Sequence, residues 1–138
     1  SCKLQVESCR LGMTKIERFE EIKSWQKGRE LCQLIYRLTN DGPFRRDFGL
    51  RDQMRRAAVS VMSNIAEGFE SQNNRTFVRF LYIAKGSAGE VRAQAYVALD
   101  QGYITQPEFD EITALSAEIS RLLSKFIAYL QNHLDRQR

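Results

Sequence analysis

The sequence is poor in several residue types that would point to particular chemistry. Among 138 residues it has one histidine, His133, two prolines, eight glycines and three cysteines. A single histidine cannot supply the Glu-x-x-His pairs on which di-iron sites in helical bundles depend. We therefore expect no metal centre and no cofactor. We interpret His133 as a solvent-facing residue of the last helical turn, where a cation suits the helix dipole.

Long apolar runs are also missing. No stretch approaches the roughly 18 consecutive apolar residues that a membrane-spanning helix needs, and no charged-then-apolar leader with a small-residue cleavage site is recognisable. These absences predict a cytoplasmic protein with no membrane partner. The odd number of cysteines argues against a disulfide framework, and Cys32, within a helical pattern, is expected to be a core residue.

Recognisable catalytic motifs are absent as well. A ribonuclease pair would place an arginine a few residues before a histidine, yet the nearest basic residues before His133 are Lys125 and Arg121. The sequence contains no glycine-rich phosphate loop, Cys-x-x-Cys pair or serine-centred nucleophile elbow. We expect no enzymatic activity.

The chain is mildly basic, with 21 Lys and Arg against 17 Asp and Glu, a net charge of +4. The positive charges crowd the middle of the chain, at Arg45, Arg46, Arg51, Arg55, Arg56, Arg75, Arg79, Lys85 and Arg92, and acidic residues follow Pro107. So small an excess permits a phosphate-bearing partner without requiring one. Any anion-binding face should therefore belong to the middle of the chain.

Apolar residues recur every three or four positions along four segments, which is the signature of amphipathic helices. The expected helices span 18–38, then from a cap at Asp47 to an end at Gly68, from a cap at Asn74 to Gly102, and from a Thr105–Glu108 capping box onward. The last two expected core stripes are Phe77, Leu81, Ala84, Ala88, Val91, Ala95 and Leu99, then Phe109, Ile112, Leu115, Ile119, Leu122, Phe126 and Leu130. These patterns predict an all-α protein, an up-and-down antiparallel four-helix bundle over residues 16–136 that follows a loose leader at 1–15.

The small-residue faces of the second and third helices, together with three aromatic residues, predict self-association. Gly86 and Gly89 each cost about 1 kcal/mol against alanine inside a helix, so we expect a neighbouring helix to approach closely there. Phe77, Phe80 and Tyr82 cannot all face one four-helix core, and a homo-oligomer would cover those that face outward.

The central block FGLRDQMRRAAVSVMSNIAEGFESQNNRTFVRFLYIAKGSAGE, followed by Gly-Tyr-Ile at 102–104, resembles the 23S rRNA intervening-sequence protein family over about residues 16–130. The resemblance implies a bacterial four-helix bundle, commonly a ring of five subunits, whose biochemical role is poorly defined. A diverged branch is similar to the accessory variability determinant of diversity-generating retroelements, a basic pentameric barrel that binds a reverse transcriptase and nucleic acid.

Several residues of this block are expected to have a structural or oligomer role: Asn64, Glu67, Gly68, Gly86, Ser87 and Glu90. The small or hydrogen-bonding positions expected to let helices two and three approach closely are Ser60, Asn64, Gly86, Ser87 and Gly89. Asn64 must find partners if it is buried. Glu67 is expected to pair with Arg55 or Arg56, within the bundle or across a subunit boundary.

Two functions stay open. In the first, an oligomer binds RNA or DNA through Arg45, Arg46, Arg51, Arg55, Arg56, Arg75 and Arg79, whose planar guanidinium groups suit phosphates. Arg51 is expected to be the least involved in the family motif. In the second, the protein is an interaction scaffold, such as an accessory subunit of a reverse transcriptase, with its arginines in subunit contacts or in pairs such as Asp52 with Arg55 or Arg56.

Overall fold

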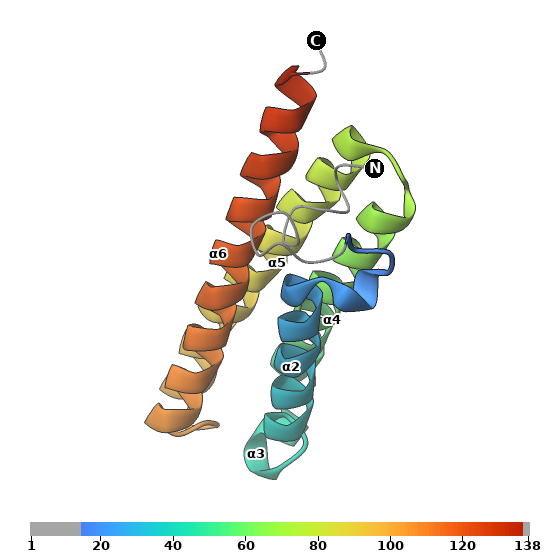
Figure 1. The fold of residues 1–138 in the computed structure, drawn as a ribbon. Coiled ribbons are helices and arrows are strands. Elements are labelled where there is room, and N and C mark those ends of the chain that lie inside the picture. Colours follow the sequence, from blue (N-terminus) through green and yellow to red (C-terminus); the bar gives the residue numbers. More distant parts are fainter. Residues whose placement is uncertain (1–14, 137–138) are drawn as a thin grey trace.

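The computed structural model describes residues 15–136, and within that range the chain is helical with no strand (Figure 1). A short 3-10 helix, η2 (Phe19–Glu21), is followed by α2 (Lys23–Leu38), α3 (Gly42–Arg46), α4 (Phe48–Glu70), α5 (Asn74–Asp100) and α6 (Gln106–Arg136). The four long helices alternate in direction, and α2 packs against α4, α4 against α5, and α5 against α6, while α6 also contacts α2. The predicted four-helix bundle is confirmed.

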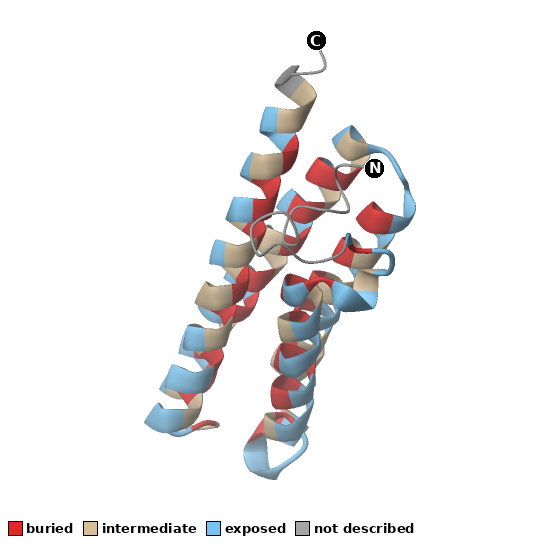
Figure 2. Cartoon of the chain, in the orientation of Figure 1, coloured by how far each residue is buried: buried red, intermediate tan, exposed pale blue. Residues whose placement is uncertain are grey.

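The core side of each long helix follows from the spacing of its apolar residues, and Figure 2 shows the buried residues lining the inside of the bundle. The α5 stripe is correct up to Ala95, but its last member is Ala98, not the predicted Leu99. In α6 the prediction is wrong at two places, because Ser116 and Leu123 are buried where Leu115 and Leu122 were expected. Apart from Ile127, the buried α6 residues alternate steps of three and four: Phe109, Ile112, Ser116, Ile119, Leu123, Phe126 and Leu130. This strict heptad seam is the pattern of helices that cross at a small angle.

Close packing of α2 on α4 depends on a glycine. A Cβ atom at Gly28 would lie 3.2 Å from Cγ1 of Val61 and 3.4 Å from Cβ of Met62, both on α4. Cys32 lies one turn further along α2, buried as expected, and its Sγ donates to the Sδ of Met62 at 3.5 Å. Burial raises the pKa of the Cys32 thiol to about 11, so this cysteine is an inert core residue at neutral pH.

Two predicted helix boundaries are wrong. Gly68 does not end the second long helix, because α4 continues to Glu70. At Gly68 a Cβ atom would lie only 2.8 Å from Cδ1 of Phe77 and from Cβ of Phe80. The glycine is therefore needed for the contact between α4 and α5. The cap of α5 is Asn73 instead of Asn74, since the Asn73 side chain accepts a hydrogen bond from the Thr76 amide at 3.0 Å.

A third boundary is also wrong, because α2 begins at Lys23 instead of Arg18 and residues 19–21 form the separate η2. The predicted boundaries at Gly102 and at Thr105–Glu108 are confirmed. The Thr105 amide donates to Glu108 Oε1 at 2.8 Å and the Glu108 amide to Thr105 Oγ1 at 3.3 Å, which is a capping box. Gly102 follows α5 with φ +75°, and the amides of Gly102 and Tyr103 donate to the carbonyls of Leu99 and Ala98. This is a Schellman motif, in which glycine takes the left-handed position without a Cβ penalty.

One end of the bundle is held together by Asp47 and Tyr103. Asp47 caps α4, with Oδ1 accepting from the Leu50 amide at 3.1 Å, and its Oδ2 accepts from the Tyr103 hydroxyl at 3.0 Å. The Tyr103 ring also stacks on Phe44 of α3, with ring centroids 5.1 Å apart. The α3–α4 junction is thereby tied to the α5–α6 turn. The hydrogen bond to Asp47 is the main cause that raises the pKa of Tyr103, with burial and the Asp47 charge adding to it.

Asp47→Ala is expected to lower the free energy of unfolding by about 1–2 kcal/mol, because it removes a helix cap and the acceptor of Tyr103 together. Chemical denaturation at pH 7 measures the change, and Asp100→Ala, at an exposed position, is the control.

Tyr103→Phe, which keeps the ring on Phe44, should also destabilise the protein. A raised pKa in the folded state means that the protonated tyrosine stabilises the fold below about pH 10. The difference in free energy of unfolding between wild type and Tyr103→Phe should therefore become smaller as the pH rises through the folded-state pKa of Tyr103.

The outer side of α5 differs from the prediction. No atom outside the local helix lies within 4 Å of a Cβ built at Gly86 or Gly89, so no helix of the described chain approaches them closely. Both glycines are exposed, in one strip with Tyr82, Ala93, Tyr96 and Val97. Phe77 is fully buried, Phe80 is half-buried and Tyr82 is 50% exposed, so these three aromatic side chains do divide between the two sides of α5. We call this strip, with the neighbouring Ile83, the outer face of α5.

None of the described helices is long and apolar enough to cross a membrane.

Candidate nucleic-acid interface

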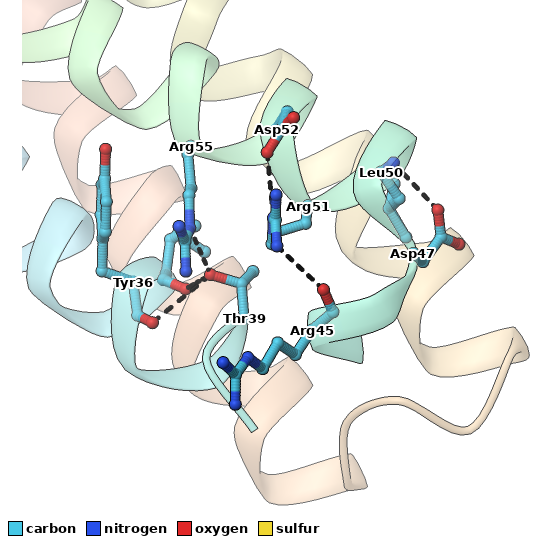
Figure 3. A network of polar contacts seen from close by, with 9 residues as sticks. Tyr36, Thr39, Arg45, Asp47, Leu50, Arg51, Asp52 and Arg55 are labelled. Carbon is cyan, nitrogen blue, oxygen red and sulfur yellow. Dashed lines mark hydrogen bonds and ion pairs between the residues drawn. The ribbon is translucent and has the colours of Figure 1, made fainter. Parts of the chain in front are cut away.

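The arginines at the start of α4 differ in how firmly the fold holds them, and Arg51 is the most constrained. Its Nε donates to Asp52 Oδ1 at 3.0 Å, and its Nη1 donates to the main-chain oxygen of Arg45 at 3.0 Å (Figure 3). Its guanidinium also lies 4.8 Å from the centre of the Phe48 ring. The side chain is only 22% exposed. Arg51 therefore joins α3 to α4 and has a structural role of its own.

Arg55 is also occupied within the chain. Its Nε donates to Thr39 Oγ1 at 2.8 Å, and its guanidinium stacks 4.6 Å from the centre of the Tyr36 ring. The Thr39 hydroxyl in turn donates to the Ile35 carbonyl at 2.7 Å. This second bond holds Thr39 Oγ1, the acceptor for Arg55, in place. Figure 3 shows the Arg55 and Tyr36 side chains lying side by side. Arg55 therefore connects α4 to the end of α2. Asp52 pairs with Arg51, so the predicted pair of Asp52 with Arg55 or Arg56 is not formed.

Arg56 is the exposed member of the cluster. It makes no hydrogen bond or ion pair with the part of the chain that the structure describes. It lies on an open hollow of about 610 Å³ lined by Tyr36, Asp52, Arg55, Arg56, Val59 and Ser60. Tyr36 is 44% exposed and Val59 38% exposed there. The hollow thus combines two guanidinium groups with an accessible aromatic ring, a combination that suits the phosphates and bases of a single strand.

The remaining predicted arginines fall into two places. Arg45 and Arg46 are exposed in the last turn of α3, next to the Arg51 network. Arg75 and Arg79 are exposed at the start of α5, with Arg79 stacked 5.4 Å from the centre of the Phe80 ring. Because α4 and α5 are antiparallel neighbours, the start of α5 lies about five helical turns from Arg51 along α4. Within one chain the two groups are separate patches, as their positions in the sequence predict.

The small polar residues of the central block join α4 to α5. The hydroxyls of Ser60 and Ser87 share a hydrogen bond of 2.8 Å between the two helices. Asn64 Nδ2 donates to the Ser60 carbonyl at 2.7 Å and to its hydroxyl at 2.8 Å. Of the expected positions, Ser60 and Ser87 therefore join the two helices, Asn64 bonds to Ser60 within α4, and Gly86 and Gly89 take no part.

The two acidic residues of the block take no part in this contact. Glu67 and Glu90 are exposed, and neither forms an ion pair within residues 15–134. The predicted pair of Glu67 with Arg55 or Arg56 is therefore not formed inside the chain. Glu67 lies near the far end of α4, about three helical turns from Arg56, beyond the reach of a direct contact along one helix. A pair across a subunit boundary stays a prediction.

Tyr36 completes this surface, and the buried Thr39 holds Arg55 from below, although the sequence did not point to either as a site residue. Tyr36 lies in the last turn of α2 and Thr39 is the C-cap of that helix, whereas Arg55 belongs to α4. The available signal was a threonine just before the Asn-Asp-Gly-Pro turn, at the end of a helix that must reverse beside α4. Among the described residues, no group of three His, Cys, Asp or Glu side chains is placed to hold a metal ion.

Comparison with protein families gives a match to the model described as 23S rRNA-intervening sequence protein, over residues 20–125. The chain belongs to this family. The resemblance in the central block is thus confirmed, and it extends from η2 into the second half of α6. In this member of the 23S rRNA-intervening sequence protein family, Ser60, Gly68 and Ser87 form the α4–α5 contact, and Asn64 holds Ser60 within α4. Tyr103 of the Gly-Tyr-Ile segment ties the end of the bundle to Asp47.

A solved structure supports the fold. It is a crystal structure of a protein of unknown function from the S23 ribosomal protein family, from Bacteroides thetaiotaomicron. It matches this family member with a TM-score of 0.70 and 24% sequence identity, over 76% of this chain and 95% of the other. A likeness at that identity establishes the helical fold alone. The curated proteins provide no match.

Proposed function

We propose that this protein is a non-enzymatic module that associates with copies of itself and binds RNA through its outward-facing arginines. The observation that carries the proposal is the hollow beside Arg56, where an unpaired guanidinium, the partly occupied Arg55 and the exposed Tyr36 ring lie together. Arg45 and Arg46 extend the positive surface along α3. Phosphate contacts of this kind fix a protein on RNA without reading its sequence.

Self-association is proposed through the outer face of α5. Tyr82, Ile83, Tyr96 and Val97 are each 45–56% exposed, and the exposed Gly86 and Gly89 leave room beside them for another backbone. An apolar strip of this kind on one helix is typical of a contact between copies of a chain. The family resemblance implies a ring of five. Repetition around a ring would turn each arginine patch into a belt and raise the local positive potential well above that of one chain. Light scattering should give a multiple of the 16.0 kDa chain mass.

Arg56→Glu is expected to weaken RNA binding several-fold at low salt and to lower the slope of log affinity against log salt by roughly 0.7, because one phosphate contact with a single strand is lost. The measurement is fluorescence anisotropy of a labelled single-stranded RNA of mixed sequence at several salt concentrations. Arg29→Glu is the matched control, since Arg29 is exposed on α2 and the charge change is the same. Arg51→Glu is a poor test, because it would break the links to Asp52 and Arg45.

Helicity and oligomer mass should not change in Arg56→Glu. If wild-type protein binds RNA without salt dependence, or if Arg56→Glu and Arg29→Glu bind as well as wild type, the RNA-binding proposal is wrong.

A protein-interaction scaffold is the second candidate. The observation that favours it is the internal engagement of Arg51 and Arg55, which makes them structural groups, together with the apolar outer face of α5. An accessory subunit of a reverse transcriptase is one form of such a scaffold, implied by the resemblance to retroelement accessory proteins. This candidate predicts retention of a protein partner in high salt, where phosphate contacts are screened.

A further inference from the structure

A second basic surface lies between α5 and α6, away from the arginines discussed above. It is an open groove of about 420 Å³ lined by Lys85, Arg92, Ala117, Ser120, Arg121, Ser124 and Lys125. Lys85 and Arg92 come from α5, and Arg121 and Lys125 come from α6. Three small residues of α6 lie between the long side chains. Among the residues that the structure describes, no acidic side chain lines the groove.

The four cations of this groove have no acidic partner. None of Lys85, Arg92, Arg121 and Lys125 forms a hydrogen bond or ion pair with the described part of the chain. The acidic residue of α6 nearest to them in sequence, Glu118, pairs with Lys27 of α2 at 3.8 Å. Like charges within a Debye length of about 8–10 Å repel one another. A bound anion would relieve that repulsion.

Helix electrostatics do not account for this arrangement. Cations stabilise a helix only near its last turn, and Lys125 lies about three turns before Arg136, where α6 ends. Lys85 and Arg92 lie in the interior of α5. Their spacing of seven residues covers about 10 Å along the helix, and the spacing of Arg121 and Lys125 covers about 6 Å. These lengths are on the scale of a few consecutive phosphates of a nucleic-acid strand, since a B-DNA strand carries one phosphate per about 3.4 Å of helix axis.

We propose that the groove between α5 and α6 binds the phosphate backbone of a single RNA strand, with Lys85 and Arg92 on one side and Arg121 and Lys125 on the other. The hydroxyls of Ser120 and Ser124 supply neutral donors to the same phosphates. The small side chains at Ala117, Ser120 and Ser124 leave room for the backbone to enter. The choice of RNA as the ligand rests on the proposed function, whereas the residues are different from those of the Arg56 hollow.

The test compares a groove variant, Arg121→Gln with Lys125→Gln, with the control pair Arg29→Gln and Lys15→Gln, which removes the same charge from exposed positions outside the groove. The probe is the labelled single-stranded RNA of mixed sequence, titrated at several salt concentrations. For two lost phosphate contacts on a single strand, the slope of log affinity against log salt should fall by about 1.4. Affinity at low salt should fall at least several-fold, with circular dichroism and oligomer mass unchanged.

Each outcome separates the two proposals. If the groove variant binds RNA as the control pair does while Arg56→Glu is weakened, the groove proposal is overturned and the proposed function stands. If only the groove variant is weakened, the groove is supported and the Arg56 surface is not the RNA site. If wild-type protein does not bind the RNA, both are overturned. A changed oligomer mass in the groove variant would also overturn the groove proposal, because the cations would then serve a subunit contact.

Discussion

Leu123→Ala is expected to lower the free energy of unfolding by about 2–5 kcal/mol, the range for deleting a fully buried leucine side chain. Leu123 has no exposed surface and belongs to the heptad seam of α6. The loss combines the removed transfer free energy with the cavity left between packed helices. Urea denaturation followed by circular dichroism measures this loss. An unchanged slope of unfolding free energy against urea concentration would show that the folded state is retained.

Leu122→Ala is the matched control. It makes the same chemical change one position earlier, where the side chain is only partly buried. Leu122→Ala should lower the free energy of unfolding clearly less than Leu123→Ala does, because less apolar surface returns to water and no enclosed cavity forms. Equal losses for the two variants, or a larger loss for Leu122→Ala, would show that the register of α6 in the bundle is wrong.

Gly68→Ala is expected to lower the free energy of unfolding by about 1–3 kcal/mol, although alanine is the better helix former by about 1 kcal/mol. The new Cβ would lie 2.8 Å from Cδ1 of the fully buried Phe77 and 2.8 Å from Cβ of Phe80. A Cβ atom moves only with its own backbone, so α4 and α5 would have to separate. Thermal and chemical denaturation of the purified variant measure the effect, and a larger residue such as Leu should be more harmful.

Gly86→Ala provides the opposite expectation for the same substitution. No neighbouring atom lies within 4 Å of its Cβ position, so the dissociated chain should gain up to about 1 kcal/mol from helix propensity. If copies of the chain meet closely at the outer face of α5, the added methyl group will weaken that association. Light scattering over a dilution series separates the two effects. A destabilised monomer would contradict the open position of Gly86.

The candidate site was only partly predictable. Runs of arginine indicated which stretch of the chain is basic, but the engagement of each arginine depended on residues from another helix. Arg55 contacts Tyr36 and Thr39 because α2 packs beside α4, and the positions of these residues in the sequence do not predict that contact. Lys85 and Arg121 are far apart in sequence, and they line one groove only because α5 and α6 are neighbours.

The sequence alone determined the four helices, their antiparallel order and most of their ends, because periodicity, capping side chains and Gly102 act locally. It also determined the family, through residues of the central block. The tertiary structure decided what local patterns leave open. Leu122 and Leu123 are both compatible with an apolar stripe, and only the rotation of α6 against its neighbours buries one of them fully. Likewise Gly68 and Gly86 are both helical glycines, and only the position of α5 makes the first a close contact and leaves the second exposed.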